Sequence, residues 1–296
     1  MRRQILSVLL FSFAASAALA GSGNHSMSVS THGGSPAGCS DLDVTIEHRA
    51  ALRAEQVLTI AAPAGSALRI QAAHNSGVYV EASDRRDVLV LACKAARTPE
   101  DLAGIRLRFE NGVLTATGPD EEPWIASLLV QVPRSAALDL DASNGPLSLR
   151  GLTGRVTAQT RNGPIQVKDC PGDIEARAQN GPIQLSGSGG NVRVETQNGP
   201  ISVKLTGSSW AGPGLEARAQ NGPLSLRIPD GYQSGAVVES AGHSPFRCKG
   251  GACDRARRLG GDDGRRVELG AGAPVVRLST VNGPVSIASA DADVED

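Results

Sequence analysis

One stretch decides the fold: residues 144–202, which read NGPLSLRGLTGRVTAQTRNGPIQVKDCPGDIEARAQNGPIQLSGSGGNVRVETQNGPIS. The tripeptide Asn-Gly-Pro begins at Asn144, Asn162, Asn180 and Asn198, each 18 residues after the previous copy. It returns at Asn221 after 23 residues and at Asn282 after 61. A fixed period within a chain indicates stacked structural repeats, each packing against its neighbours.

Within each repeat, apolar residues alternate with polar residues on both sides of the Asn. The third residue after the Asn is aliphatic in all six copies: Leu147, Ile165, Ile183, Ile201, Leu224 and Val285. The sixth residue before the Asn is also aliphatic, as at Val156, Ile174, Val192, Leu215 and Val276. Strict alternation is typical of a strand with one buried face. Each 18-residue unit is therefore predicted to be two short strands joined by corners.

Two architectures fit strands joined by Asn-Gly. Asn-Gly is the strongest short signal for a β-hairpin with a type I′ turn. Here a proline follows the glycine, and the residue before a proline is pushed away from the backbone angles that such a turn needs. We therefore expect an all-β fold of the β-solenoid type: parallel stacked coils of about 18 residues, with two short strands per coil. The structural corner residues Asn144, Asn162, Asn180, Asn198, Asn221 and Asn282 are then expected to stack as a ladder of side-chain hydrogen bonds.

The first 20 residues have the features of a secretory signal peptide. Arg2 and Arg3 precede the apolar run 5–18, and Ala18-Leu19-Ala20 is a small-x-small cleavage site. The apolar run is too short to span a membrane. We expect an exported, soluble protein without a transmembrane segment, located in the periplasm, at the cell surface or outside the cell.

The mature chain divides into four further segments. We expect a flexible leader at 21–40, an irregular β cap with the first coils at 41–140, solenoid repeats at 141–290 and an acidic tail at 291–296. The cap contains eight candidate strands: 43–48, 57–61, 67–72, 78–82, 88–92, 105–109, 113–117 and 126–132. Residues 66–82, with Asn75-Ser76-Gly77, look like a degenerate coil, and 98–103 looks like a helical turn capped by Thr98.

A family resemblance follows from this order of features. An irregular strand region, the step Leu129-Val130-Gln131-Val132-Pro133 and then alternating strands punctuated by Asn-Gly resemble the bacterial DUF4097 family, also called "putative adhesin" proteins. The resemblance covers about residues 55–290. It implies a β-solenoid exported to the cell envelope, with no established catalytic residues. The proline after nearly every Asn-Gly and the insertion at 229–272 depart from the commonest family pattern.

Two interruptions of the repeat are the candidate binding regions. The segment 207–214 adds five residues to one coil, and 229–272 replaces about two coils. Insertions into repeats project on one face and are often used for binding. The ring-bearing side chains of these segments are candidate ligand contacts: Trp210, Tyr232, His243 and Phe246. The alternative is that these side chains only pack the insertions onto the stack.

The five cysteines are expected to form two disulfides, because an exported protein occupies an oxidising compartment. Cys248 and Cys253 are close in sequence and would staple the insertion, and Cys39 and Cys93 could tie the leader to the cap. Cys170 is left over. The cysteine spacing does not fit a zinc site, and we expect no metal and no cofactor.

The composition argues against several functions. The formal net charge is −1 and aromatic residues make up 3% of the chain, so nucleic-acid binding is unsupported. The sequence contains no nucleophile, phosphate-loop or dinucleotide motif. The acids Glu175, Glu195 and Glu216 fall near one another on the predicted outward face, but arginines alternate with them, as expected for a solvated charge ladder.

Three hypotheses about function remain. The first is an exported, non-catalytic envelope protein, an adhesin or scaffold that binds a glycan or a protein partner through its surface. The first alternative is a polysaccharide-active enzyme on a β-helix, which would need clustered carboxylates. The second alternative is an accessory factor in envelope assembly or stress signalling.

Overall fold

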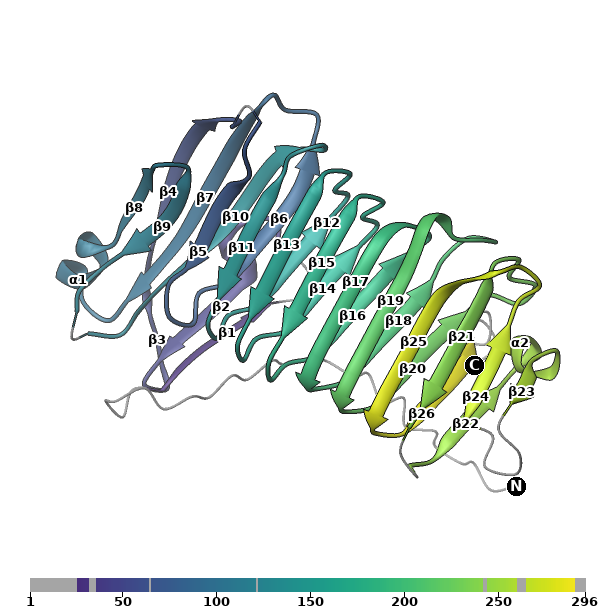
Figure 1. The fold of residues 1–296 in the computed structure, drawn as a ribbon. Helices are drawn as coiled ribbons and strands as arrows, with labels where there is room; N and C mark the ends of the chain where they lie inside the picture. Colours follow the sequence, from purple (N-terminus) through teal and green to yellow (C-terminus); the bar gives the residue numbers. More distant parts are fainter. Residues whose placement is uncertain are drawn as a thin grey trace, which may run out of the picture.

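The computed structural model describes residues 26–31, 36–63, 65–120, 122–241, 244–259 and 265–290. The proposed signal peptide at 1–20 and the acidic tail at 291–296 lie outside the described residues. The fold is all-β, as predicted, and is dominated by two large sheets of 12 and 11 strands. Figure 1 shows these sheets as an elongated stack, with α1 near one end and α2 near the other.

Each repeat contributes one strand to each large sheet, and we call such a pair of consecutive strands a coil. The regular coils pair in parallel and in register, so that Ile165 lies beside Ile183 and Ile183 beside Ile201. Their strands, with the member of the 12-stranded sheet first, are β5 (Leu68–Ala72) and β6 (Val78–Ser83), β11 (Leu138–Ala142) and β12 (Leu147–Arg150), β13 (Arg155–Thr160) and β14 (Ile165–Lys168), β15 (Asp173–Ala178) and β16 (Ile183–Gly187), β17 (Gly189–Asn198) and β18 (Ile201–Leu205), and β19 (Ala211–Asn221) and β20 (Leu224–Ile228).

The core lies between the two sheets and consists mainly of aliphatic side chains. Ile165, Ile183 and Ile201 are fully buried, as are Val156 and Val276. The predicted alternation of inward apolar and outward polar residues is therefore confirmed. The degenerate coil is also confirmed, because β6 pairs in parallel with β12 and β5 with β11.

At both ends of the stack, the order of coils in space differs from their order in the sequence. β6 lies between β12 and β10 (Trp124–Pro133), and β5 lies between β11 and β9 (Val113–Thr117). At the other end, β26 (Val285–Ser289) lies between β20 and β22 (Phe246–Lys249), and β25 (Pro274–Asn282) lies between β19 and β21 (Gly235–Ser240). The insertion 229–272 was expected to project from a face. Instead it supplies the outermost coil, β21 and β22. The coil that follows it in sequence, β25 and β26, lies between this outermost coil and β19 and β20.

Antiparallel strands border the stack at both ends, except beside β22, which is the outermost strand of the 11-stranded sheet. β4 (Leu52–Ala61) and β7 (Asp87–Ala96) continue the 11-stranded sheet beyond β10. β8 (Arg106–Glu110) borders β9 at the same end, and β23 (Arg257–Leu259) and β24 (Arg266–Leu269) border β21 at the other. Short helices accompany them, α1 (Pro99–Gly104) and α2 (Gly251–Asp254). The predicted cap of α1 is confirmed, since the Thr98 hydroxyl accepts a hydrogen bond from the Asp101 N–H at 3.1 Å.

The leader is not wholly irregular. β1 (Met27–Thr31) pairs antiparallel with β2 (Leu42–Ile46), which also pairs antiparallel with β3 (Arg49–Ala50). The segment 21–40, predicted to be a flexible leader, thus contains one paired strand, Met27–Thr31. The sequence MSVST does alternate, but it carries a single large aliphatic residue, Val29, inside a serine-rich segment.

Candidate functional site

The Asn-Gly-Pro corners form one continuous ladder along the stack. From Asn162 onward, each Asn Nδ2 donates a hydrogen bond to the Oδ1 of the preceding Asn of the series, over 2.8–3.0 Å. Six residues take part: Asn144, Asn162, Asn180, Asn198, Asn221 and Asn282. An amide carries both a donor and an acceptor, so it can bond the coil on each side. The ladder is thus a structural element, in which the Asn side chains hydrogen-bond to one another.

The glycine after each Asn is required by stacking rather than by backbone angle. None of these corner glycines has a positive φ. A Cβ at Gly163 would lie 2.1 Å from the carbonyl oxygen of Gly145, and one at Gly181 would lie 2.2 Å from that of Gly163. The corners are in such close contact that only a hydrogen atom fits between them.

The candidate ligand-contact rings are mostly interior. Trp210 is 6% exposed and donates its Nε1–H to the Gly190 carbonyl at 3.0 Å, and Tyr232 is 5% exposed. Burial raises the pKa of the Tyr232 hydroxyl to about 12. Phe246 is half-buried against the same core, and His243 lies outside the described residues. Buried rings offer no surface for stacking on a ligand, so we assign Trp210 and Tyr232 to packing of the two insertions.

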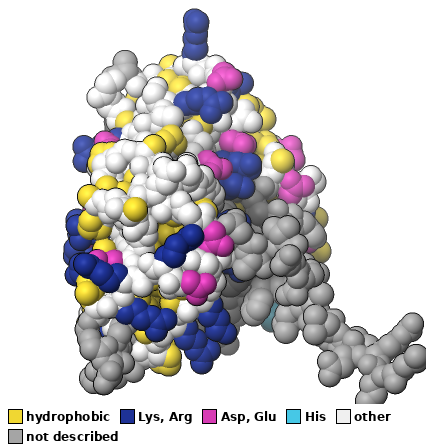
Figure 2. Space-filling model, turned by 90° about the vertical axis from the view of Figure 1, so that its right-hand side faces the viewer, with side chains coloured by type: hydrophobic (Ala, Val, Ile, Leu, Met, Phe, Trp, Pro, Cys, Tyr) yellow, Lys and Arg dark blue, Asp and Glu magenta, His cyan; other side chains and the backbone are white. Residues whose placement is uncertain are grey.

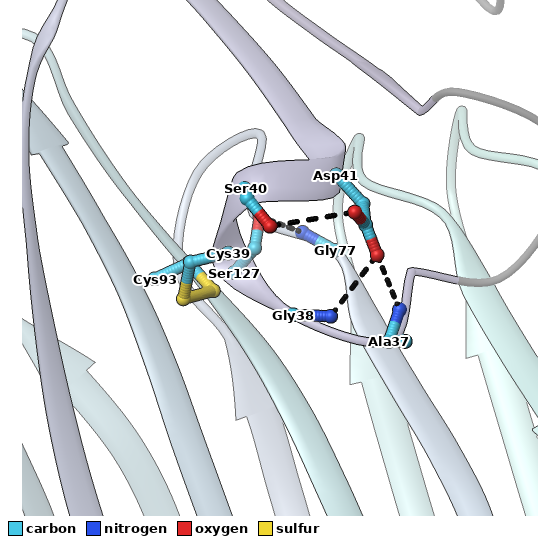
Figure 3. The surroundings of a disulfide bond; sticks show 8 residues. All are labelled: Ala37, Gly38, Cys39, Ser40, Asp41, Gly77, Cys93 and Ser127. Carbon is cyan, nitrogen blue, oxygen red and sulfur yellow. Dashed lines mark hydrogen bonds between the residues drawn. A yellow bond between two sulfur atoms is a disulfide. The ribbon is translucent and has the colours of Figure 1, made fainter.

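Both expected disulfides are present. Cys39 and Cys93 join the segment before β2 to β7, with their Cα atoms 5.3 Å apart (Figure 3). Beside this bond the Asp41 carboxylate accepts the Ala37 N–H at 2.9 Å and the Gly38 N–H at 3.2 Å, which orders the turn entering β2 (Figure 3).

The second disulfide and the unpaired cysteine lie in the repeat region. Cys248 and Cys253 link β22 to α2 within the insertion. Cys170 is a buried free thiol, and burial raises its pKa. A thiol with a raised pKa is largely un-ionised and a poor nucleophile at neutral pH, so Cys170 acts as a small apolar core residue.

The outer face of the 12-stranded sheet carries paired charges, and we call it the charge-paired face. In register, Glu175, Arg193 and Glu216 form one column, and Arg177, Glu195 and Arg218 form the next. Arg177 contacts both Glu175 and Glu195, Arg193 contacts Glu195 at 2.8 Å and Glu216 at 3.5 Å, and Arg218 contacts Glu216. The alternation of arginines with the three acids, predicted from the sequence, is confirmed: Arg193 stands between Glu175 and Glu216, and Glu195 stands between Arg177 and Arg218.

These ion pairs determine what the carboxylates can do. The Arg193 guanidinium, as hydrogen-bond donor, holds the pKa of Glu195 below its usual range, and Glu195 raises the pKa of Arg193. A general acid in glycoside hydrolysis needs a carboxyl group whose pKa is raised, beside a second carboxylate. The charge-paired face has the opposite electrostatics. Across the described ranges, no three His, Cys, Asp or Glu side chains gather where they could hold a metal ion.

The outer face of the 11-stranded sheet is different, and we call the part from β12 to β22 the basic face. Its seven adjacent strands contain no Asp or Glu but six basic residues: Arg150, Lys168, Lys204, Arg227, Arg247 and Lys249. A groove of about 520 Å³ runs across five of these strands and is lined by residues that include Lys168, Gln184 and Lys204.

Hydrophobic patches and membrane-spanning helices do not mark a further site. On the side seen in Figure 2, hydrophobic side chains are scattered among charged and neutral ones rather than gathered into one patch. In the part of the chain that the structure describes, no helix is both long and apolar enough to cross a membrane.

Comparison with known proteins gives matches in structure alone. No family profile matches the sequence, and neither does any curated protein. Among solved structures, a "putative adhesin" from Bacteroides fragilis is 10% identical with a TM-score of 0.34, covering 80% of this chain and 97% of its own. A "putative cell adhesion protein" from Clostridium sporogenes is 9% identical with a TM-score of 0.32, covering 80% and 100%. A "putative lipid binding protein" from Parabacteroides distasonis is 12% identical with a TM-score of 0.32, covering 80% and 96%. Membership of the DUF4097 family stays a prediction.

Proposed function

We propose that this chain is an exported β-solenoid that serves as an adhesin or scaffold of the cell envelope and catalyses no reaction. It binds an envelope glycan or protein through its long outer faces. The observation that carries this proposal is the in-register stacking of the coils, which aligns the outward positions of successive coils in columns along the stack. Such a surface suits an extended ligand better than a small substrate, which needs a concave pocket.

The chemistry of the outward acids supports a binding role over the alternative of a polysaccharide-active enzyme. Each of Glu175, Glu195 and Glu216 contacts at least one arginine, so none is a free general acid or base. Repeats of this kind are commonly used as extended binding surfaces. Two disulfides are consistent with export, because disulfides persist in oxidising compartments.

The test combines export, binding and turnover in one preparation. The full-length chain is produced in a bacterium with its own N-terminus, the envelope and medium are fractionated, and the exported form is sequenced from its N-terminus. We expect cleavage after Ala20. The purified protein is then applied to a panel of immobilised bacterial and plant polysaccharides, and bound protein and newly formed reducing ends are both measured. We expect retention without new reducing ends.

A matched variant separates the two functions. Turnover that disappears in Glu195→Gln would show that the chain is an enzyme and overturn the proposal. Retention on no glycan and on no purified envelope protein would also overturn it. A chain found only in the cytoplasm would remove the envelope role.

A further inference from the structure

The two outer faces of the stack differ in charge, and the basic face carries positive charges without acids in its own strands. The chain contains four lysines, and three of them, Lys168, Lys204 and Lys249, project from β14, β18 and β22 on this one face. All three are exposed, and no ion pair holds any of them within the described residues. The charge-paired face instead uses arginine, which suits bidentate pairing with carboxylates. The two faces of one stack are thus built for different purposes.

The cations stand in a single column. Parallel register places Arg150 beside Lys168, Lys168 beside Ser186 and Ser186 beside Lys204, and the column continues through Arg227 and Ala288 to Lys249. Neighbouring strands are about 4.8 Å apart, so the seven strands place five cations along roughly 29 Å. The first of these, Arg150, also lies 3.9 Å from the carboxylate of Glu81 on the adjacent strand β6. A second column lies two residues earlier in each strand and ends on Arg247 in β22. Its other six side chains are neutral and able to form hydrogen bonds: Ser148, Gln166, Gln184, Ser202, Ser225 and Ser286.

We propose that the basic face binds a linear acidic polysaccharide, laid along the stack across the strands. Carboxylates of successive sugars pair with the lysine and arginine column, and sugar hydroxyls bond the serine and glutamine column. This inference rests on the proposed binding function and names the class of its ligand. The polysaccharide would lie in the groove that crosses five strands. Both columns line this groove, at Lys168, Gln184, Ser202 and Lys204.

The spacing of charge favours an acidic glycan over nucleic acid. Duplex DNA carries one negative charge per 1.7 Å or so of axis, and proteins that bind single strands add aromatic rings for the bases. The basic face has one cation per strand at most of its strands, and the outward positions of β12 to β22 that the structure describes carry no aromatic ring. One carboxylate per sugar matches this lower density. Without rings to stack on, a neutral polysaccharide gains little here.

Polygalacturonate oligomers test the inference, with the fully methyl-esterified oligomers as the neutral control on the same backbone. We expect the intact protein to bind the acidic oligomers, to lose affinity as salt is added, and to bind the esters at least tenfold more weakly. Acetylation of lysines followed by mass spectrometry gives a second readout. The acidic oligomer should protect Lys168, Lys204 and Lys249 and leave the rate at Lys94 unchanged.

Matched double variants locate the site. Lys168→Gln with Lys204→Gln should weaken binding roughly 2- to 30-fold, the loss of two exposed ion pairs. Arg155→Gln with Arg277→Gln removes the same charge from exposed positions on the opposite face and should leave affinity unchanged. Thermal denaturation of each variant confirms that it is folded.

Several outcomes would overturn the inference. Equal affinity for the esterified oligomers, equal loss in both double variants, or stronger binding of duplex DNA or of phosphatidylglycerol vesicles would each do so. Those results would leave a binding function intact, whereas cleavage of the oligomers would instead remove the proposed non-catalytic role.

Discussion

The sharpest test of the stacked corners is the substitution Gly181→Ala. A Cβ at this position would lie 2.2 Å from the carbonyl oxygen of Gly163 and 2.9 Å from its carbonyl carbon. A Cβ atom does not approach a non-bonded heavy atom this closely, so one corner must move away from the other. The φ angle of Gly181 is not positive, so alanine meets no penalty from the backbone itself. Any loss of stability therefore reports the contact between coils.

The magnitude follows from the hydrogen bonds that the movement breaks. Three of them converge on this corner: Asn180 Nδ2 to Asn162 Oδ1 at 2.9 Å, Asn198 Nδ2 to Asn180 Oδ1 at 2.9 Å, and Thr196 Oγ1 to the Gly181 carbonyl at 3.1 Å. Each contributes about 0.5–1.5 kcal/mol net. We expect Gly181→Ala to lower the free energy of unfolding by roughly 1.5–4.5 kcal/mol, the sum of the three.

Gly187 provides a control in the same coil. Its φ is also outside the left-handed region, and the nearest atom to its Cβ would be the Asp169 nitrogen at 3.9 Å, an ordinary van der Waals distance. Gly187→Ala should leave stability unchanged or raise it by about 0.4–1 kcal/mol, because alanine restricts the unfolded chain. Urea unfolding followed by circular dichroism measures both variants. Equal midpoints for Gly181→Ala and the wild type would refute the stacked-corner explanation of the glycines.

Three further substitutions test the core, the charge ladder and the first disulfide. Ile183→Asp buries a carboxylate without a partner and should abolish the cooperative thermal transition, whereas Ile183→Val should cost only about 0.5–1.5 kcal/mol; a wild-type transition for the aspartate variant would contradict the inward assignment. The pKa of Glu195 is depressed, so its contribution is present above the unfolded value of about 4.3 and is lost as the pH falls through the folded value. Glu195→Gln should therefore cost about 0–1 kcal/mol at pH 7, and that difference should shrink at pH 3 in paired thermal scans. Cys39→Ser with Cys93→Ser opens a loop with a sequence separation of 54, which corresponds to about 4 kcal/mol of unfolding free energy in the chain-entropy estimate; an unchanged urea midpoint would argue against the bond.

The interior of the fold could be predicted from the sequence because its signal is periodic and local. An aliphatic residue three positions after each Asn fixes the inward face, and the constant interval fixes the register between neighbours. That is why Ile165, Ile183 and Ile201 stack as expected. Proline after the glycine was the decisive local clue, since it disfavoured the hairpin.

The candidate site was harder to predict, because the role of a side chain depends on its neighbours across coils. Trp210 and Tyr232 stood out as rare aromatic residues in insertions, yet both fill the core. The charge ladder is the exception, because the alternation of arginines with the acids was visible in the sequence and the register places Arg193 between Glu175 and Glu216. The sequence analysis missed the basic face, although the sequence contains its pattern. Lys168 and Lys204 each stand six residues after an Asn, and no acid occurs in the strands that carry them.

The reversed order of coils at the two ends explains why the stack stops. A stack of identical coils could in principle continue indefinitely. The unpaired edge strands at its ends could also pair with another copy of the protein. Here the regular coils never form the ends, because β9 and β10 close one side and β21 and β22 close the other. β10 and β21 are then bordered by antiparallel strands, whose direction does not continue the parallel register, whereas β22 is the outermost strand of its sheet. The last coil of the chain also has paired neighbours on both sides, so its strands cannot recruit a second molecule. The outermost insertion coil needs β25 and β26 as its platform, and it can dock only after the C-terminal strands have been made.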